Sequence, residues 1–341
     1  MASAPPIGLP LSLLQWQKSI AQRRMIIFFT LQIYKIKGKV VQITNFYYFC
    51  AMKNLITKVG DYLKLVKFSH TIFAMPFAMM AFVFALKTTD VEFSWVLLLQ
   101  IVGCMVFARN VAMGFNRWTD YKIDGENPRT ADREIPAGKI SPKSALIFVI
   151  VNALLFIAVS LSINLLTAVL SPVALSVIMF YSYCKRFTSL AHIVLGLSLG
   201  IAPSAAYIAA TGTLTFAPCL ISLLVLTWCG GFDIIYALQD LDFDRKRGLH
   251  SIPVRFGVRG ALNISIILHA ISIVSLILFA LQCPQGWLLW CGVALFSLCI
   301  TVEHILVTPT KQRNIGIAFG TLNGIASLTL ATFTIAQLLI G

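Results

Sequence analysis

The chain has 341 residues, of which 58% are hydrophobic, and a formal net charge of +14. Its mean hydropathy is +0.84, whereas an ordinary soluble domain is only about 45–50% apolar, so the composition excludes such a domain. Excess Lys and Arg are typical of membrane-protein loops, where they fix the topology and contact anionic lipid. The positive charge therefore indicates a protein in contact with membrane lipid and is no argument for a nucleic-acid partner.

Residues 1–51 differ from the rest of the chain. They contain six basic residues, no acidic residue and one short apolar run, Met25–Leu31. A transit peptide is also basic and free of acids but usually richer in Ser, and the apolar run is too short for a secretory signal. Met52 opens a stretch that resembles an ordinary N-terminus. We expect residues 1–51 to be an N-terminal extension, either disordered or the result of a mis-assigned start, and residues 52–341 to form the membrane domain.

Nine apolar stretches long enough to cross a bilayer follow Met52. None shows the period-two alternation of barrel strands, so helices are the expected spanning elements. The predicted spans are 68–86, 95–116, 144–163, 165–183, 190–210, 216–236, 261–281, 285–306 and 315–340. The expected fold class is therefore all-α, a multi-pass transmembrane bundle of about nine helices.

Basic residues are confined to alternate loops of this arrangement. They occupy the segment before the first span and the loops after the second, fourth, sixth and eighth spans, and the opposite side has Lys87 alone. Lys and Arg are retained in cytoplasmic loops. The asymmetry predicts that the N-terminus and these loops are cytoplasmic and that the C-terminus lies on the far side.

Nine of the thirteen acidic residues lie in two short stretches, each directly after a long apolar segment. In both stretches carboxylates recur at i and i+4, so on a helix they project from one face and can share a hard cation such as Mg²⁺. A solvated helix end is the plain alternative, but it does not explain why acids are nearly absent from every other loop. We expect the two stretches to bind Mg²⁺ that carries a diphosphate.

Two charged residues are predicted to lie inside the membrane. Arg109 begins a helical stripe that continues through Asn116 to Asp124, and it lies about two turns deeper than Asn116. Asp233 begins a matching stripe that ends at Asp244. A charge at that depth is costly and indicates a functional or paired residue, although Arg109 has the alternative of snorkelling to the interface.

The two stretches also form a weak internal repeat. Asp120 and Asp124 recur as Asp240 and Asp244, and Ile135-Pro136 recurs as Ile252-Pro253. Because repeats in membrane proteins often frame a central site, two facing copies are expected to enclose one central cavity. Basic residues of the adjoining loops would neutralise the charge on the diphosphate leaving group. The candidates for this role are Lys122, Arg129, Arg133, Lys185 and Arg186.

Three segments of the sequence resemble the signatures of the UbiA family of intramembrane aromatic prenyltransferases. The first is Asn116-x-x-x-Asp120-x-x-x-Asp124, followed by Asn127-Pro-Arg129-Thr-Ala-Asp-Arg133-Glu-Ile-Pro-Ala-Gly-Lys-Ile. The middle segment is Tyr181-Ser-Tyr-Cys-Lys185-Arg186-Phe-Thr, followed by Leu195-Gly196 and Gly200-x-x-Pro203. The last is Asp233-Ile-Ile-Tyr236-Ala-Leu-Gln-Asp240-x-x-x-Asp244-x-x-x-Gly248. The resemblance covers about residues 60–340.

The resemblance implies helices around a central cavity, a polyprenyl diphosphate donor, an aromatic acceptor and Mg²⁺. It also implies that five residues hold the metal ions, namely Asn116, Asp120, Asp124, Asp240 and Asp244. Asp120 and Asp240 would act in catalysis as metal ligands. For Asp233 we expect a catalytic role in orienting the acceptor hydroxyl or in stabilising positive charge.

The match is closest to the 4-hydroxybenzoate polyprenyltransferase branch, which serves ubiquinone biosynthesis. That branch often has an Arg and a Lys-Pro pair near the start of the first span, where this chain has Lys64, Lys67 and His70. A naphthoate acceptor of menaquinone biosynthesis is therefore an alternative. Either acceptor carries a carboxylate that needs a cationic partner in a dry cavity, and the candidates are Arg109, Lys67 and His70. We expect a bacterial inner (plasma) membrane location with cytoplasmic active-site loops, or alternatively the mitochondrial inner membrane.

Two other classes of membrane protein compete with this interpretation. A secondary transporter also carries charges in its spans, but its acids would lie at helix centres, whereas most acids here lie at the predicted cytoplasmic ends. A CDP-alcohol phosphotransferase packs its acids into one Asp-x-x-Asp-Gly-x-x-Ala-Arg motif, and the sequence lacks that order. The sequence therefore favours a Mg²⁺-dependent prenyltransferase.

Overall fold

The structure is a computed structural model that describes residues 52, 57–66, 74–310 and 315–341. The chain divides into two compact units, Met1–Gly60 and Asp61–Gly341, and every helix discussed below belongs to the second. The predictions for residues 1–51, for Lys67 and for His70 lie outside the described residues.

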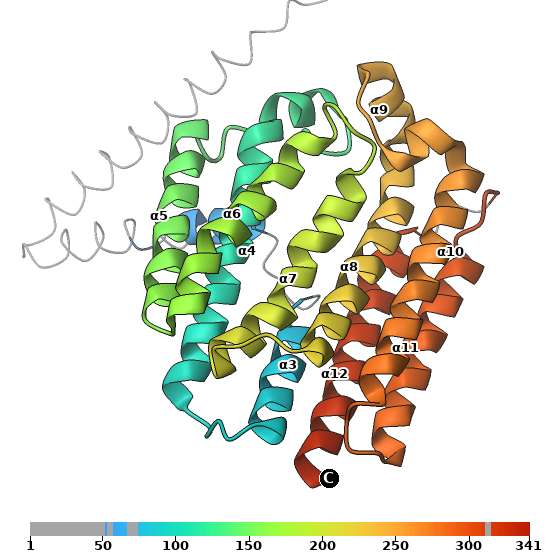
Figure 1. The fold of residues 1–341 in the computed structure, drawn as a ribbon. Coiled ribbons are helices and arrows are strands. Elements are labelled where there is room, and N and C mark those ends of the chain that lie inside the picture. The colour runs from blue at the N-terminus through green and yellow to red at the C-terminus, as the bar shows by residue number, and fades with distance from the viewer. Residues whose placement is uncertain (1–51, 53–56, 67–73, 311–314) are drawn as a thin grey trace, which may run out of the picture. The chain divides into compact units, whose positions relative to one another are not determined.

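All regular elements of residues 74–310 and 315–341 are helical, which confirms the predicted fold class (Figure 1). Eight of the helical segments are long and apolar enough to cross a membrane, and α3 is shorter, with 14 residues. They follow the predicted spans in the same order. Their bounds are α3 Met75–Thr88, α4 Trp95–Glu126, α5 Pro142–Leu161, α6 Leu165–Cys184, α7 Ala191–Thr211, α8 Phe216–Ala237, α9 Leu241–Arg247, α10 Ile252–Ala280, α11 Trp287–Leu306 and α12 Asn323–Ile340.

Polar side chains fix where four of these helices begin. The first backbone N–H groups of a helix have no partners within the helix. A Ser or Asn side chain at the N-cap accepts a hydrogen bond from one of these groups. The four caps are Ser94 before α4, Ser141 before α5, Asn164 before α6 and Ser251 before α10.

Neither acidic stretch is simply the end of a straight membrane helix. The second predicted span does not stop near residue 116, because α4 continues as one 32-residue helix to Glu126. The predicted stripe from Arg109 to Asp124 therefore lies on a single helix. On the other side α8 ends at Ala237, and a 3₁₀ turn, Leu238–Asp240, precedes α9. A 3₁₀ helix has about three residues per turn instead of 3.6, so the second stripe is bent at Asp240.

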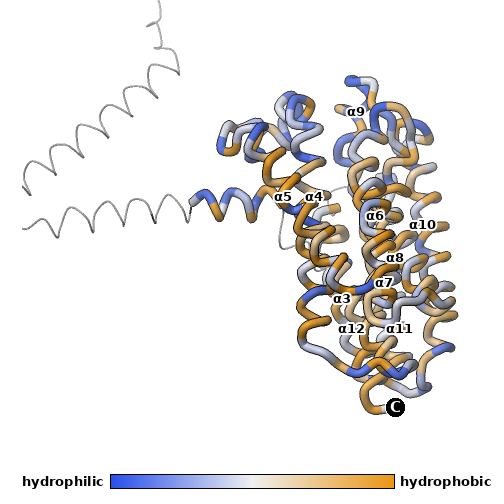
Figure 2. Tube along the Cα trace, turned by 60° about the vertical axis from the view of Figure 1, so that its left-hand side comes forward, coloured by the Kyte–Doolittle hydropathy of each residue, from blue (hydrophilic) through white to orange (hydrophobic). Residues whose placement is uncertain are grey.

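The loops after α4, α6 and α8 lie together at one end of the bundle, and the C-terminus lies at the other end (Figure 1). Hydrophilic residues gather at the end that carries α9, while the helices below it are mostly hydrophobic (Figure 2). Loops that were predicted to share one side of the membrane thus share one end of the molecule. Which side is cytoplasmic stays a prediction.

Helices α7 and α8 pack backbone against backbone. A Cβ atom at Gly196 would overlap the carbonyl oxygen of Leu226, and one at Gly200 would lie 2.7 Å from the carbonyl oxygen of Ser222. Small residues four positions apart allow this close approach between membrane helices. The glycines thereby hold the first half of α7 against the middle of α8, ahead of the turn that carries Asp233.

Candidate active site

The two acidic motifs meet at the polar end of the bundle. Asp240, in the 3₁₀ turn after α8, accepts hydrogen bonds from the side chains of Arg129 and Asn127, which belong to the loop after α4. The Nε–Oδ1 distance to Arg129 is 2.8 Å and the Nδ2–Oδ1 distance to Asn127 is 3.1 Å. Arg129 also donates to the hydroxyl of Tyr236 at 3.0 Å. The motifs therefore form one site rather than two.

Each of the four motif carboxylates faces one basic side chain of a loop. One of these pairs lies within a single motif, and the other three join segments that are distant in sequence. The pairs are Asp120–Arg186 at 2.9 Å, Asp124–Arg133 at 2.6 Å, Asp244–Lys185 at 3.7 Å, and Asp240–Arg129. Four of the five basic residues predicted to bind diphosphate are thus gathered around the predicted metal ligands.

Lys122 is the predicted diphosphate-binding residue that the structure does not bring to this cluster. It is exposed and belongs to none of the ion pairs found among the described residues. Residues two positions apart on a helix do not share a face, so Lys122 points away from the side of α4 that carries Asp120 and Asp124. Its role in binding stays a prediction.

Lys185 and Arg129 keep their positive charge although each side chain is partly shielded from solvent. Burial alone would lower the pKa of Lys185, but the charge of Asp244 and of three further aspartates outweighs it and raises the pKa. Burial likewise opposes the charge of Arg129, and its hydrogen bonds and ion pair with Asp240 raise its pKa above the ordinary value. Both side chains are therefore cations available to a phosphate group.

The oxygen ligands of the site fit Mg²⁺. This cation is bound in proteins by one or two carboxylates together with substrate phosphate oxygens, and it keeps several waters. Asp244 Oδ2 is buried and has no hydrogen-bond partner, and Asn116 lies beside Asp120, with its Nδ2 3.3 Å from Oδ2. The described residues contain no preassembled group of three or more His, Cys, Asp or Glu side chains. The ligand set thus suits a metal that arrives with its phosphate.

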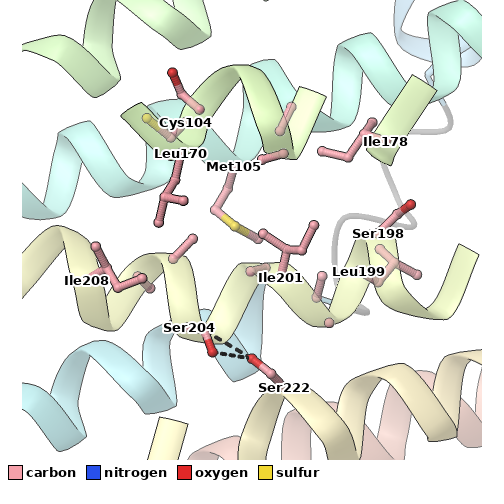
Figure 3. Close-up of a pocket in the computed structure, with 18 of the residues that line it drawn as sticks. Cys104, Met105, Leu170, Ile178, Ser198, Leu199, Ile201, Ser204, Ile208 and Ser222 are labelled. Atoms are coloured by element: carbon pink, nitrogen blue, oxygen red, sulfur yellow. Dashed lines mark hydrogen bonds between the residues drawn. The ribbon is translucent and has the colours of Figure 1, made fainter. Parts of the chain in front are cut away.

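An apolar cavity of about 570 Å³ adjoins this site, lined mainly by α4, α6, α7 and α8 (Figure 3). Its walls are mainly aliphatic, with Met105, Leu170 and Ile201 among the labelled side chains, and polar contacts such as Ser204–Ser222 are few. The cavity matches the predicted central cavity in its position between the helices that carry the two motifs.

Arg109 on α4 and Tyr181 on α6 both line the cavity. Arg109 Nε is buried without a hydrogen-bond partner, and Arg109 takes part in none of the ion pairs found among the described residues. Tyr181 lies close enough to Arg109, Asp120 and Asp233 to interact with their charges. An uncompensated guanidinium in an apolar cavity is costly, and this arrangement leaves it free for an anionic ligand.

Comparison with known proteins identifies the family. The model of the UbiA prenyltransferase family matches residues 74–332, well over half of the chain. The chain belongs to the UbiA prenyltransferase family. The predicted family and the predicted class of enzyme, a prenyltransferase, are confirmed.

Relatives of this UbiA family member include two bacterial enzymes named 4-hydroxybenzoate octaprenyltransferase. The one from Aeromonas salmonicida is 32% identical over 196 residues, which cover 58% of this chain and 68% of the relative. The one from Citrobacter koseri is 33% identical over 202 residues, which cover 59% of this chain and 67% of the relative.

Solved UbiA structures share the fold. The apo structure of a UbiA homolog from Aeropyrum pernix K1 superposes with a TM-score of 0.67 at 29% identity, covering 80% of this chain and 97% of the homolog. A UbiA homolog from Archaeoglobus fulgidus, solved bound to GPP and Mg²⁺, has a TM-score of 0.65 at 20% identity, covering 82% of this chain and 99% of the homolog.

Several residues of this UbiA site escaped the sequence analysis. Asn127 and Tyr236 were part of the quoted motifs but had no predicted role, and the structure shows both in contact with the Arg129–Asp240 pair. His192 likewise had no predicted role, yet its Nδ1 lies 2.6 Å from Asp233 Oδ2. The available signal was its spacing: His192, Gly196 and Gly200 fall on one face of α7.

Proposed function

We propose that this UbiA family member transfers a polyprenyl group from a polyprenyl diphosphate to an aromatic acid in a Mg²⁺-dependent reaction. The proposal rests on two chemically different regions that lie next to each other. The polar end holds four basic side chains and four carboxylates, and an apolar cavity adjoins it. A polyprenyl diphosphate has the same two parts, a charged head and an apolar chain.

The diphosphate head is bound at the polar end. Arg129, Arg133, Lys185 and Arg186 supply its cationic contacts, and Arg side chains bind phosphate oxygens in a bidentate manner. Asn116, Asp120, Asp124, Asp240 and Asp244 would hold Mg²⁺, which when bound neutralises charge on the diphosphate leaving group. A UbiA homolog from Archaeoglobus fulgidus was solved bound to GPP and Mg²⁺, which supports a prenyl diphosphate and a divalent metal as ligands.

The apolar cavity receives the prenyl chain and keeps water away from the reacting carbon. When the allylic C–O bond breaks, its electron pair leaves with the diphosphate, and the allylic cation is protected in a site from which water is excluded. A ring carbon of the acceptor then forms the new C–C bond, and the displaced ring proton passes to an oxygen of the released diphosphate. The aliphatic lining of the cavity suits both the chain and the cation's need for a dry environment.

The acceptor is held between Arg109 and Asp233. Arg109 lines the cavity with no carboxylate partner among the described residues, so it is the candidate for the acceptor carboxylate, together with Lys67 and His70. Asp233 orients the ring hydroxyl. The 4-hydroxybenzoate octaprenyltransferases of Aeromonas salmonicida and Citrobacter koseri support 4-hydroxybenzoate as the acceptor, with a naphthoate as the alternative. The bacterial inner membrane, with the polar end facing the cytoplasm, is the proposed location.

Purified protein tests this function. The protein in lipid vesicles is incubated with Mg²⁺, a radiolabelled polyprenyl diphosphate and, in separate reactions, 4-hydroxybenzoate, a dihydroxynaphthoate or benzoate. We expect a labelled, solvent-extractable product with 4-hydroxybenzoate and none with benzoate, which lacks the activating hydroxyl. Product with the naphthoate alone would select the alternative acceptor, and absence of product with every acid would refute the proposed function.

A further inference from the structure

Asp233 has a hydrogen-bonding partner on α7 whose role the proposed reaction leaves open. Asp233 Oδ2 lies 2.6 Å from Nδ1 of His192. His192 is fully buried, and its Nε2 has no hydrogen-bond partner in the described part of the chain. Since a buried N–H without an acceptor is costly, we assign the ring hydrogen to Nδ1, from which it is donated to the carboxylate.

The packing of α7 on α8 places His192 at this position. His192, Gly196 and Gly200 occupy one face of α7, and the two glycines bring that face into contact with the backbone of α8. Gly230 faces the same turn, since a Cβ there would lie 3.4 Å from the carbonyl oxygen of His192. The imidazole therefore reaches Asp233 directly.

We infer that His192 is a positioning residue, which fixes the Asp233 carboxylate in the orientation that meets the acceptor hydroxyl. The inference rests on the proposed function, in which Asp233 contacts the acceptor. A hydrogen bond to Oδ2 leaves Oδ1 for the substrate and stops the carboxylate from turning toward Lys185, whose charge interacts with it. Removal of a partner that orients a metal-ligating side chain typically costs about 10–100-fold in metal affinity or activity, and we expect a loss of the same order for a partner that orients a substrate-contacting carboxylate.

A simpler role for the same contact is packing alone. A hydrogen bond between two buried helices contributes to stability whatever it does for the reaction. The two roles differ in what a substitution changes: loss of packing lowers the thermal midpoint, whereas loss of positioning lowers kcat and leaves diphosphate binding intact. The test therefore needs kinetic and thermal measurements on the same variants.

Three variants of the full chain separate these roles. His192→Leu removes the donor, and His192→Asn retains an N–H donor close to the position of Nδ1. Ser265→Ala is the matched control, because the Ser265 hydroxyl donates at 2.8 Å to the carbonyl oxygen of Gly231, in the same turn of α8 as Asp233, and Ser265 is fully buried. For each variant kcat, both KM values and the thermal midpoint are measured.

We expect His192→Leu to lower kcat about tenfold or more and to change the KM for polyprenyl diphosphate less than about twofold. His192→Asn should recover most of the lost kcat, and Ser265→Ala should retain the wild-type kcat even if its thermal midpoint falls. A wild-type kcat for His192→Leu would overturn the inference. Equal losses of kcat in His192→Leu and His192→Asn would also overturn the inference.

Failure of the proposed function is a different result. In that case the wild-type protein prenylates no aromatic acid, whatever happens in the variants. The contact between His192 and Asp233 can still be tested on its own, because ¹⁵N NMR distinguishes a ring hydrogen on Nδ1 from one on Nε2. The spectrum is simple, since the chain has only five histidines. The His192 signal, identified by its loss in His192→Asn, should report Nδ1–H and change in Asp233→Asn. A signal that reports Nε2–H would refute the assigned contact.

Discussion

Arg129 and Asp240 form an ion pair that joins the loop after α4 to the end of α8, although the two residues lie 111 positions apart. The same carboxylate accepts a hydrogen bond from Asn127, and the same guanidinium donates one to Tyr236. One cation thus connects the two acidic motifs directly. Residues of this contact are the most informative positions for mutation.

Asp240→Asn should lower kcat at least about a hundredfold, since it removes a proposed metal ligand and a charge from the diphosphate site. Insertion into the membrane should persist, because the Asp240 side chain contacts polar loop groups and not the apolar core. The control is Asp242→Asn, the same change at an exposed neighbour that belongs to none of the ion pairs of the described residues. Wild-type turnover in Asp240→Asn would disprove the metal role.

Arg129→Gln should raise the KM for polyprenyl diphosphate about tenfold or more, as expected when a hydrogen bond to a charged group is lost. Arg129→Lys should recover only part of that affinity, because an ammonium cannot form the bidentate contact. Steady-state kinetics with saturating acceptor measures the effect. Arg245→Gln, at an exposed position of α9, controls for net charge. Equal KM changes in both Gln variants would indicate a general electrostatic effect.

Arg109→Leu should raise the KM for the aromatic acid strongly and leave the KM for the prenyl diphosphate nearly unchanged. The guanidinium lines the apolar cavity and has an unpaired Nε, so an acceptor carboxylate is the anion that it can pair with there. Varying each substrate separately distinguishes the two affinities. An equal loss of both would place Arg109 at the diphosphate instead.

Chelation of divalent metal should stop the reaction. EDTA is expected to abolish product formation by the native protein, and excess Mg²⁺ should restore it, because hard oxygen ligands without a bound cation leave the diphosphate charge uncompensated. The measurement is product formation before chelation, after it and after Mg²⁺ is added back. Undiminished turnover in EDTA would contradict the proposed metal dependence.

Gly196→Ala should destabilise the protein by about 1–3 kcal/mol, the usual cost of overpacking a tight contact, because the added Cβ would overlap the Leu226 carbonyl oxygen. Since the same contact sets the distance between His192 and Asp233, kcat should fall as well. Gly324→Ala is the matched control: a Cβ there meets nothing within 4 Å, and it too lies in a helix. Thermal unfolding in detergent compares the two. Equal midpoints would show that α7 and α8 can separate without cost.

The sequence predicted the order and approximate limits of the membrane helices, because apolar length is a direct signal. It also predicted that Arg109 and Asp124 share one helix, since α4 continues without a break. The bend at Asp240 was missed because i and i+4 spacing is compatible with both a straight helix and one interrupted by a single 3₁₀ turn.

Ion-pair partners were beyond the reach of the sequence. Arg133 pairs with Asp124 of its own motif, whereas Arg129, four residues earlier, crosses to Asp240. Both arginines belong to one compact loop, and only the path of that loop decides which carboxylate each one meets. His192 was missed for a related reason, because its partner belongs to another helix and only the glycines four and eight residues later indicated the contact.

The four carboxylate–cation pairs also constrain how substrate enters. Asp120, Asp124, Asp240 and Asp244 each face one Lys or Arg, so these four pairs together carry no net charge when the site is empty. A diphosphate bound alone would make the site strongly negative. A divalent cation bound alone would compete with the Lys and Arg side chains for the carboxylates. Each ligand relieves the imbalance that the other creates, so their binding is thermodynamically linked, and the linkage is reciprocal. Such a site selects the metal–diphosphate complex over either component.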